Sequence, residues 1–229
     1  MKILAIGAHP DDIEIFMFGL LTLFKERGDH VFLMIATDGS MGGANKGKLL
    51  KNKRKLETIA ALNNLSLPVF LNIPDGELGA DPQHKKVIKE NILKIMPDLI
   101  ITHSQNDYHA DHRSLSLLAS SSVSHYIPIM YCDTLMGINF QPNYYVDITA
   151  IFSMKKKAIL NHHSQDPQRF VDLFILMNSY RAAQCNSPKG SYAEAYSFTQ
   201  SFPFADIRNI LPPSPKLRPF YIEKQHGFL

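Results

Sequence analysis

The fold of this chain is decided by residues 2–12, which read KILAIGAHPDD. Residues 2–6 form a short, nearly unbroken apolar run, which is typical of a strand that is buried on both faces of a parallel sheet. Gly7 and Ala8 keep bulk away from the point where this strand ends. The sequence therefore predicts an α/β protein whose first strand lies inside the sheet.

One imidazole and two carboxylates follow this strand directly: His9, Asp11 and Asp12. In open α/β sheets, ligands bind outside the carboxyl ends of the strands, so this polar cluster is a candidate site by its position. Either aspartate could also cap the next helix, because Asp is a favoured N-cap residue. A cap does not account for His9 and the second carboxylate. We therefore favour a metal site for zinc or another divalent ion.

The rest of the chain alternates between helical patterns and short apolar runs. A helix at 13–27 and a strand at 30–37 complete a βαβ unit, whose crossover is expected to be right-handed. Further strands are predicted at 67–73, 98–102, 128–132 and 144–148, and further helices at 46–63, 82–96, 114–123, 151–162 and 171–183. Repeated prolines predict an extended Pro-rich tail over 202–229. Because we find no linker, we expect residues 1–229 to form a single domain with a mostly parallel sheet flanked by helices.

The composition argues against several kinds of partner. A formal charge of +3, from 24 basic and 21 acidic side chains, does not call for nucleic acid or an anionic membrane. The two cysteines, Cys132 and Cys185, form no CxxC pair, so we expect reduced thiols in a cytoplasmic protein. No apolar stretch is long enough for a membrane span, and no signal peptide is expected. The Phe and Tyr residues of the tail indicate weakly that the chain forms a homo-oligomer.

A second polar cluster follows the strand predicted at 98–102. It contains His109, Asp111 and His112. The carboxyl ends of parallel strands meet at one edge of a sheet, so we expect this cluster to lie near His9. A single loop histidine is usually just exposed to solvent, but two histidines and an aspartate opposite a similar cluster indicate a functional site.

Two groups of charged residues have an ordinary structural interpretation. Arg54 and Glu57 lie one turn apart on a predicted helix, where an exposed pair would contribute only a few tenths of a kcal/mol, about 0.2–0.5. The three lysines at 155–157 are expected to form a solvated helix face.

The glycine-rich loop at 38–43 is not a phosphate-binding GxxxxGK[ST] loop, because no Lys-Ser or Lys-Thr pair ends it.

The two polar clusters together resemble the signatures of the PIG-L/LmbE family of zinc-dependent de-N-acetylases. Residues 8–12, AHPDD, match the first signature. Residues 109–112, HADH, are similar to the second, which is usually written HPDH. Weaker similarities follow the same order at 54–57, 74–76 and 162–165, so the resemblance covers most of residues 1–200. It implies a Rossmann-like α/β fold, and an enzyme that removes the acetyl group from an N-acetylglucosamine-type sugar or sugar conjugate.

The resemblance also implies a zinc site held by His9, Asp12 and His112. Three protein ligands leave a fourth position open for water, as a catalytic zinc site requires. Asp11 would be the general base that takes a proton from this water. The two adjacent aspartates could divide the work in this way, since one carboxylate binds the ion and the other stays free.

The same resemblance implies roles for three further residues. His109 would stabilise the oxyanion or protonate the leaving amine, a task that suits a side chain with an ordinary pKa near neutral pH. Asp111 would orient His109. Arg54 would contact the sugar-like substrate, which is the alternative to its interpretation as part of an exposed ion pair.

Two other functions are weighed against sugar deacetylation. The first is hydrolysis of another amide, such as a mycothiol- or bacillithiol-type conjugate. The loops at 39–48 and 133–143, which would shape the pocket, contain no residue pattern that distinguishes this reaction from sugar deacetylation. The second is a nucleotide-binding Rossmann module without hydrolytic activity. Such a module needs a GxGxxG turn after the first strand, whereas residues 7–12, GAHPDD, place carboxylates where a pyrophosphate would bind.

Overall fold

Seven strands form one sheet in the computed structural model, which describes residues 1–43, 46–123, 127–198 and 211–213. Their bounds are β1 Lys2–Gly7, β2 His30–Thr37, β3 Val69–Ile73, β4 Leu99–Thr102, β5 Ile129–Cys132, β6 Tyr144–Asp147 and β7 Ala193–Phe198. The strand order is β3-β2-β1-β4-β5-β7-β6. Strands β1 to β5 are parallel, and β7 runs antiparallel to both of its neighbours. The predicted α/β fold with a mostly parallel sheet is confirmed.

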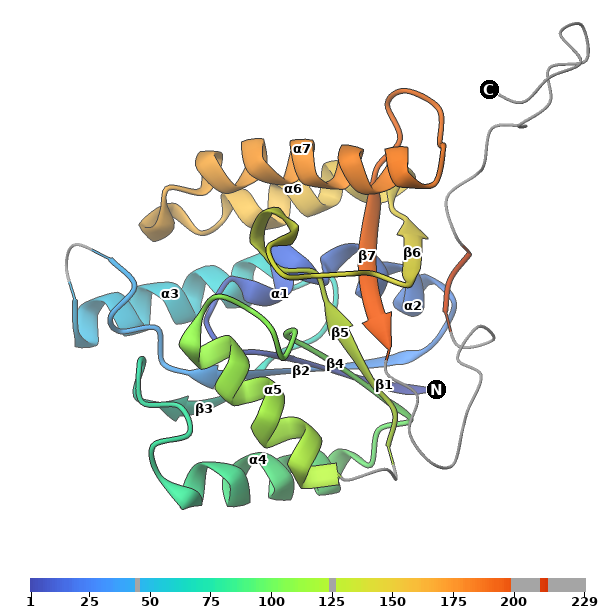
Figure 1. Ribbon diagram of the computed structural model, residues 1–229. Coiled ribbons are helices and arrows are strands. Elements are labelled where there is room, and N and C mark those ends of the chain that lie inside the picture. The colour runs from blue at the N-terminus through green and yellow to red at the C-terminus, as the bar shows by residue number, and fades with distance from the viewer. Residues whose placement is uncertain (44–45, 124–126, 199–210, 214–229) are drawn as a thin grey trace, which may run out of the picture.

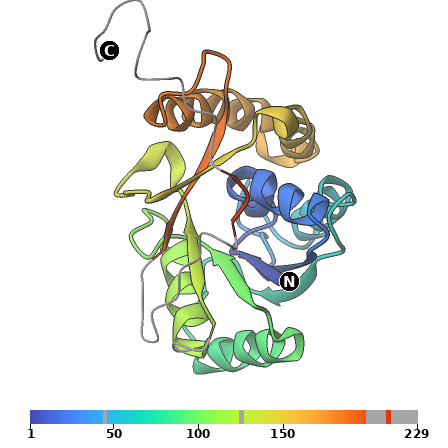
Figure 2. The same cartoon turned by 90° about the vertical axis from the view of Figure 1, so that its right-hand side faces the viewer.

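Helices cover both faces of the sheet (Figure 1) (Figure 2). One face carries α1 Asp12–Phe16, α2 Phe18–Glu26, α3 Lys48–Ala61, α6 Phe152–Leu160 and α7 Pro167–Gln184. The other face carries α4 Pro82–Ile95 and α5 Ala110–Val123. Three short 3-10 turns complete the order: η1 Leu135–Gly137, η2 Thr149–Ile151 and η3 His163–Gln165.

Strand β1 divides the core into two layers. Ile3 and Ala5 pack in the layer beneath α1, α2, α6 and α7, whereas Leu4 and Ile6 pack in the layer beneath α4 and α5. All four side chains are fully buried. This alternation follows from the pleat, because successive side chains of a strand point to opposite faces. The apolar run at residues 2–6 is therefore explained by a strand that feeds both layers.

Three features of the fold differ from the prediction. The helix expected at 13–27 is interrupted at Met17, whose φ of −131° is not helical, so that α1 and α2 are separate. Helix α5 begins at Ala110, four residues earlier than expected, which places Asp111 and His112 in its first turn. Strand β7 was not predicted at all.

Lys155 is buried, and its prediction as part of a solvated face is wrong. Its ammonium lies 2.7 Å from Oε1 of Glu194 on β7. The same carboxylate accepts hydrogen bonds from the backbone N–H groups of Gly19 and Leu20, and from the hydroxyl of Tyr196. This network ties the start of α2 to α6 and β7, and it satisfies a charge pair that burial alone would disfavour.

Two further sequence expectations concern the tail and membrane-spanning helices. The Pro-rich tail predicted at 202–229 lies outside the described residues, apart from 211–213. Among the helices that the structure describes, none combines the length and apolar character needed to cross a membrane.

Candidate active site

The turn after β1 carries His9, Asp11 and Asp12, whose side chains are all buried. Asp12 is the first residue of α1, and its Oδ2 accepts a hydrogen bond of 2.6 Å from the backbone N–H of His9. Asp11 has a φ of 138° and, within the described residues, makes no side-chain cap hydrogen bond. A non-glycine residue in such a conformation costs about 1–3 kcal/mol and is typical of functional sites. Helix capping therefore explains neither aspartate.

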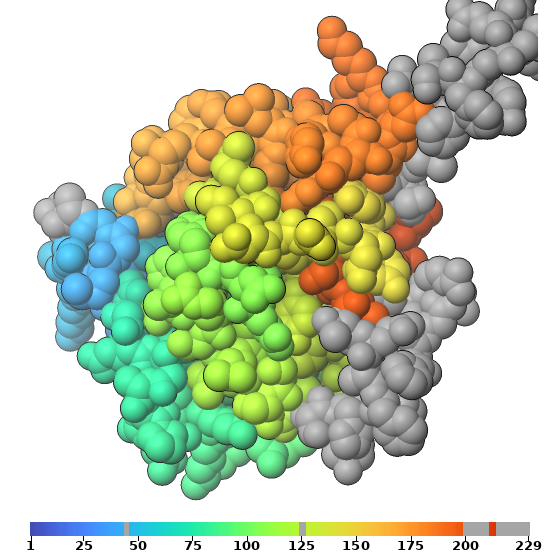
Figure 3. All heavy atoms as spheres, viewed as in Figure 1, coloured from blue at the N-terminus to red at the C-terminus, as the bar shows by residue number. Residues whose placement is uncertain are grey.

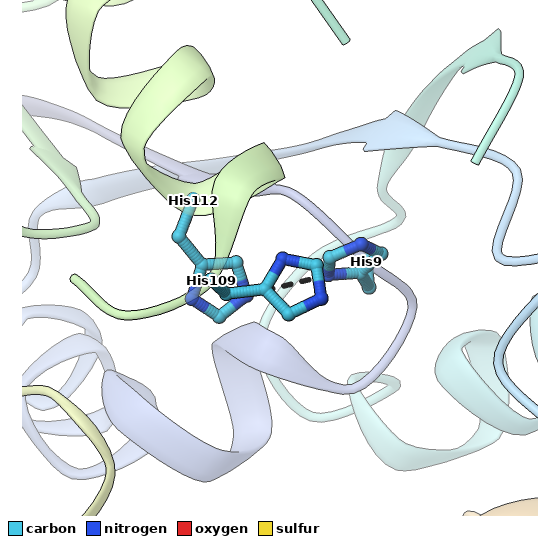
Figure 4. Close-up of side chains that lie close together, drawn as sticks. All are labelled: His9, His109 and His112. Carbon is cyan, nitrogen blue, oxygen red and sulfur yellow. Dashed lines mark hydrogen bonds between the residues drawn. The ribbon is translucent and has the colours of Figure 1, made fainter. Parts of the chain in front are cut away.

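Three side chains suited to a metal ion, those of His9, Asp12 and His112, form a small triangle at this edge of the sheet. Nδ1 of His9 lies 3.3 Å from Nε2 of His112 and 3.4 Å from Oδ2 of Asp12. The other Asp12 oxygen, Oδ1, lies 3.4 Å from Nε2 of His112. Ligands bound at about 2.0–2.1 Å to a tetrahedral ion lie roughly 3.3–3.4 Å apart, so the spacing fits such an ion. Figure 4 shows the two imidazoles turned toward each other, with His109 beside them.

Further carboxylates bind the outer nitrogens of these two histidines. Nε2 of His9 lies 3.2 Å from Asp111 and 3.3 Å from Asp75, while Nδ1 of His112 lies 3.1 Å from Asp107. Carboxylates placed in this way fix the tautomer and orientation of metal-binding histidines. Asp75 and Asp107 were not singled out in the sequence. The Pro-Asp-Gly at 74–76 gave a weak signal for Asp75, and nothing near Asp107 indicated its contact with His112.

His103 is a fourth histidine in this cluster that the sequence did not single out for a role. It is fully buried, and burial together with nearby His112 lowers its pKa to about 4, so the ring is neutral. Its Nε2 accepts the backbone N–H of Ala8 at 3.1 Å, yet it also lies 3.0 Å from Oδ2 of Asp12. With its one lone pair directed at Ala8 N–H, that nitrogen has no proton to give Asp12. Asp12, His103 and His112 are close enough together to surround a metal ion, but the His103 lone pair on this side is already used by Ala8 N–H.

The cluster carries more negative than positive charge. Burial alone would lower the pKa of His112, but the Asp12 and Asp107 carboxylates raise it to about 9. Burial alone would raise the pKa of Asp12, but the positive charge of His112 holds it well below its usual range. The carboxylates around the two histidines stabilise positive charge between them. Nδ1 of His9 and Nε2 of His112, which face each other, offer lone pairs to a cation once their rings are neutral. The donor set therefore fits a divalent cation of the kind that takes imidazole and carboxylate ligands.

Arg54 is buried beside Asp11, and its interpretation as an exposed ion pair with Glu57 is wrong. Its guanidinium donates to the carbonyl oxygens of Gly39 and Pro10 and lies 3.1 Å from Oδ1 of Asp11. Burial raises the pKa of Asp11 and the Arg54 charge lowers it, with a net rise. Arg54 thus holds both the backbone and the carboxylate of the strained turn, while it also lines the cavity described below.

His109 is half-buried and lies beside the two histidines of the triangle. Its ring centroid is 4.7 Å from those of both His9 and His112. Its Nδ1 accepts a hydrogen bond from the backbone N–H of Asp111, so the neutral ring carries its proton on Nε2. Burial and the charges of His9 and His112 lower the pKa of His109, which favours this neutral form. The Asp111 carboxylate contacts His9 instead of His109, so the predicted orienting contact is made by backbone alone.

Residues 162–165 contact the two helices, α1 and α3, that carry Asp12 and Arg54. His162 lies 2.8 Å from Glu14 of α1 in a buried pair, and Ser164 donates to the Glu57 carboxylate through both its backbone N–H and its hydroxyl. Gln165 reaches the cavity wall. The partner of Glu57 is therefore a distant serine, which joins α3 to η3.

A cavity of about 370 Å³ lies over these residues. Asp11, Asp12, Arg54, His109 and His112 line it on its polar side. Its apolar lining comes from Ile15, Phe16, Met41, Leu135 and Phe170. All seven residues predicted as ligands, catalytic groups or substrate contact are thus brought to one hollow at the carboxyl edge of β1 and β4.

Residues 4–123 match the family model described as PIG-L, GlcNAc-PI de-N-acetylase, which is more than half of the chain. The chain belongs to the PIG-L family. A diacetylchitobiose deacetylase of Thermococcus kodakarensis is 28% identical over 195 residues, with 76% of this chain and 73% of the relative covered. The N,N'-diacetylchitobiose deacetylase of Pyrococcus horikoshii has a TM-score of 0.75 and 26% identity over 86% of this chain and 83% of that structure.

The PIG-L fold also occurs with a different chemistry. The 4-carboxy-2-hydroxymuconate hydratase of Pseudomonas putida has a TM-score of 0.76 at 20% identity, over 87% of this chain and 96% of that structure. At this identity the likeness concerns the fold alone. The reaction of this PIG-L chain has to be argued from its own site.

Proposed function

We propose that this chain is a zinc-dependent hydrolase that removes the acetyl group from an N-acetylated sugar or sugar conjugate of the N-acetylglucosamine type. The observation that supports it is the triangle of His9, Asp12 and His112, with Asp11 and His109 lining the same cavity. Membership of the PIG-L family and the deacetylase relatives favour the same reaction.

His9 Nδ1, His112 Nε2 and the Asp12 carboxylate would hold the ion. When bound there, zinc supplies Lewis acidity toward water and toward the amide carbonyl. Asp75, Asp107 and Asp111 keep the outer nitrogens of the two histidines protonated, so that the inward nitrogens present lone pairs.

Asp11 would be the general base. Its Oδ1 is held by Arg54, while Oδ2 makes no hydrogen bond to any described residue and is available to take a proton from water. The raised pKa of this buried carboxyl makes it a stronger base than an exposed aspartate. The oxygen of the water adds to the acetamide carbonyl carbon as its proton passes to Asp11.

His109 would act on the tetrahedral adduct that forms when water adds to the carbonyl carbon. Its Nε2–H can donate to the oxygen that gains charge in the tetrahedral adduct. The C–N bond then breaks, and the amine nitrogen takes the proton that Asp11 received from the water, while His109 keeps its Nε2 proton and stays neutral. The products are acetate and the free amino sugar, so atoms and charges balance.

The test combines metal analysis with an acetate-release assay on one preparation of the full chain. We expect about one divalent ion per chain and acetate release from N-acetylglucosamine or one of its conjugates. Acetylated glucosaminyl conjugates of the mycothiol and bacillithiol type form a second arm, and activity restricted to them would select that alternative. A metal-loaded chain that releases no acetate in either arm would refute the proposed reaction.

A further inference from the structure

A second and larger hollow lies beside the cavity, on the other side of the loop that precedes α5. Its volume is about 990 Å³, and it lies between residues 104–108, residues 137–143 and the end of β7. In Figure 3 the yellow segment around 140 and the lime segment around 110 meet on this face, with the orange end of β7 beside them. Tyr108 lines both hollows. We refer to this second hollow as the amide cleft.

The lining of the amide cleft is polar, and its charged groups are already bound. Both carboxylate oxygens of Asp107 are engaged, one by the backbone of His109 and one by the ring of His112. Arg113 donates to the carbonyl oxygens of Asp107 and Tyr108. The amide cleft therefore offers no free charge for a phosphate or a carboxylate group.

Three side-chain amides in the amide cleft remain free to bind a ligand. Asn106, Asn139 and Gln141 are exposed, and their amide groups make no hydrogen bond in the part of the chain that the structure describes. A side-chain amide both donates and accepts, which matches the hydroxyl groups of a neutral polyol. Tyr108 and Phe140 add aromatic surface to the same lining, which can pack on apolar ring faces.

We propose that the amide cleft binds the further sugar units of an N-acetylated oligosaccharide whose reacting unit lies in the cavity over His9 and His112. This inference rests on the proposed function and names its substrate class. The cavity of about 370 Å³ is at the lower end of the range for ligand sites, roughly 300–1,000 Å³, whereas the amide cleft is at its upper end. A substrate chain would pass Tyr108 between them.

The loop at 103–109, between β4 and α5, lies between the two hollows. It presents Asn106 to the amide cleft and His109 to the cavity, and Asp107 lines the cleft while it holds His112. Sugar units in the amide cleft would therefore contact the loop that positions the reaction. Binding energy from such remote parts of a substrate can support the reaction at the other end.

The experiment compares chain lengths on the zinc-loaded full chain. The substrates are N-acetylglucosamine, N,N'-diacetylchitobiose and N,N',N''-triacetylchitotriose, and the quantity is kcat/KM for acetate release. We expect kcat/KM to rise with length. In the double variant Asn139→Gly, Gln141→Ala, the ratio of trisaccharide to monosaccharide kcat/KM should fall about tenfold, as expected for two lost hydrogen bonds. Glycine at 139 preserves the positive φ of 57° at that position.

The control is Asn63→Ala, which removes an exposed amide that lines neither hollow. It should leave the ratio unchanged. An unchanged ratio in the double variant, or equal kcat/KM for all three lengths, would overturn the amide-cleft proposal while the deacetylase assignment stands. Failure to release acetate from any of the three sugars would instead contradict the proposed deacetylase function.

Discussion

Residues 4–123 and residues 127–198 contribute to the site in different ways. The first region matches the family model and supplies every residue that we assign to metal binding or to catalysis. The second region supplies Leu135 and Phe170 to the cavity wall and residues 137–143 to the amide cleft. Its strand β7 is antiparallel, in contrast to the parallel strands β1 to β4. On our proposals, the first region supplies all of the reaction chemistry, and both regions contribute to the surfaces that would contact the substrate.

The largest effect should follow from loss of a proposed metal ligand in the first region. His112→Ala and His9→Ala should each strip the ion and reduce acetate release to background, because the two imidazoles provide two of three ligands. Metal content by mass spectrometry and activity are measured on the same samples. His163→Ala, which removes an exposed histidine of the second region, is the control and should keep both. Full metal retention in both ligand variants would refute the assignment.

The next effect separates the two adjacent aspartates. Asp11→Asn should keep the ion but lower turnover by roughly 10²–10⁴, the usual range for a positioned acid or base. Asp12→Asn should instead weaken metal binding, with activity partly restored by added zinc. Metal titration and kcat distinguish the two outcomes. If Asp11→Asn loses the ion and Asp12→Asn keeps it, the two roles are reversed.

Arg54→Met should affect both reaction and stability. Loss of the guanidinium leaves the Asp11 carboxylate buried without its partner, which should cost about 3–5 kcal/mol in the free energy of unfolding. We expect kcat/KM to fall roughly 10–100-fold, because Asp11 is no longer held in place. Urea unfolding and acetate release provide the measurements. The double variant Arg54→Met, Asp11→Asn should regain part of the stability, and no regain would show that Asp11 is not the relevant partner.

The smallest effect on activity should come from the second region. Lys155→Met breaks the buried pair with Glu194 and should lower the free energy of unfolding by roughly 3 kcal/mol. Metal content and kcat/KM per folded chain should stay as in the wild type, because this network lies outside the cavity lining. Lys157→Met, at an exposed position of α6, should change stability by less than about 0.5 kcal/mol. Loss of metal in Lys155→Met would erase the proposed division between the two regions.

The sequence predicted the parallel part of the fold well, because β1, β2 and β4 are apolar runs that end in polar turns. It did not predict β7, whose segment AEAYSF holds a glutamate in the middle of a buried strand. That charge is tolerated only because Lys155, 39 residues away, and the N–H groups of α2 meet it. Such a partner cannot be found by reading local periodicity.

The site was predicted by its clusters but not by its supporting contacts. His9, Asp12 and His112 could be named from two motifs, and the structure brings them together. Asp75 and Asp107 are single aspartates in turns, and only the folded chain places them against histidines. The burial of Arg54 depends on the carbonyl groups of Pro10 and Gly39, which lie far from it in sequence. The single domain, the homo-oligomer, the cytoplasmic location and the absence of a nucleic-acid partner stay predictions.

The separation of His9 from His112 along the chain sets an order of events during synthesis. His112 is made 103 residues after His9, which takes roughly 5–20 s at ordinary rates of translation. For most of that time β1 also lacks β4, its neighbour in the sheet, which ends at Thr102. The ribosome therefore presents two candidate ligands well before the third exists. The proposed metal site is therefore complete only after the middle of the chain has been synthesised, so we expect the ion to bind at a late stage of translation or after it.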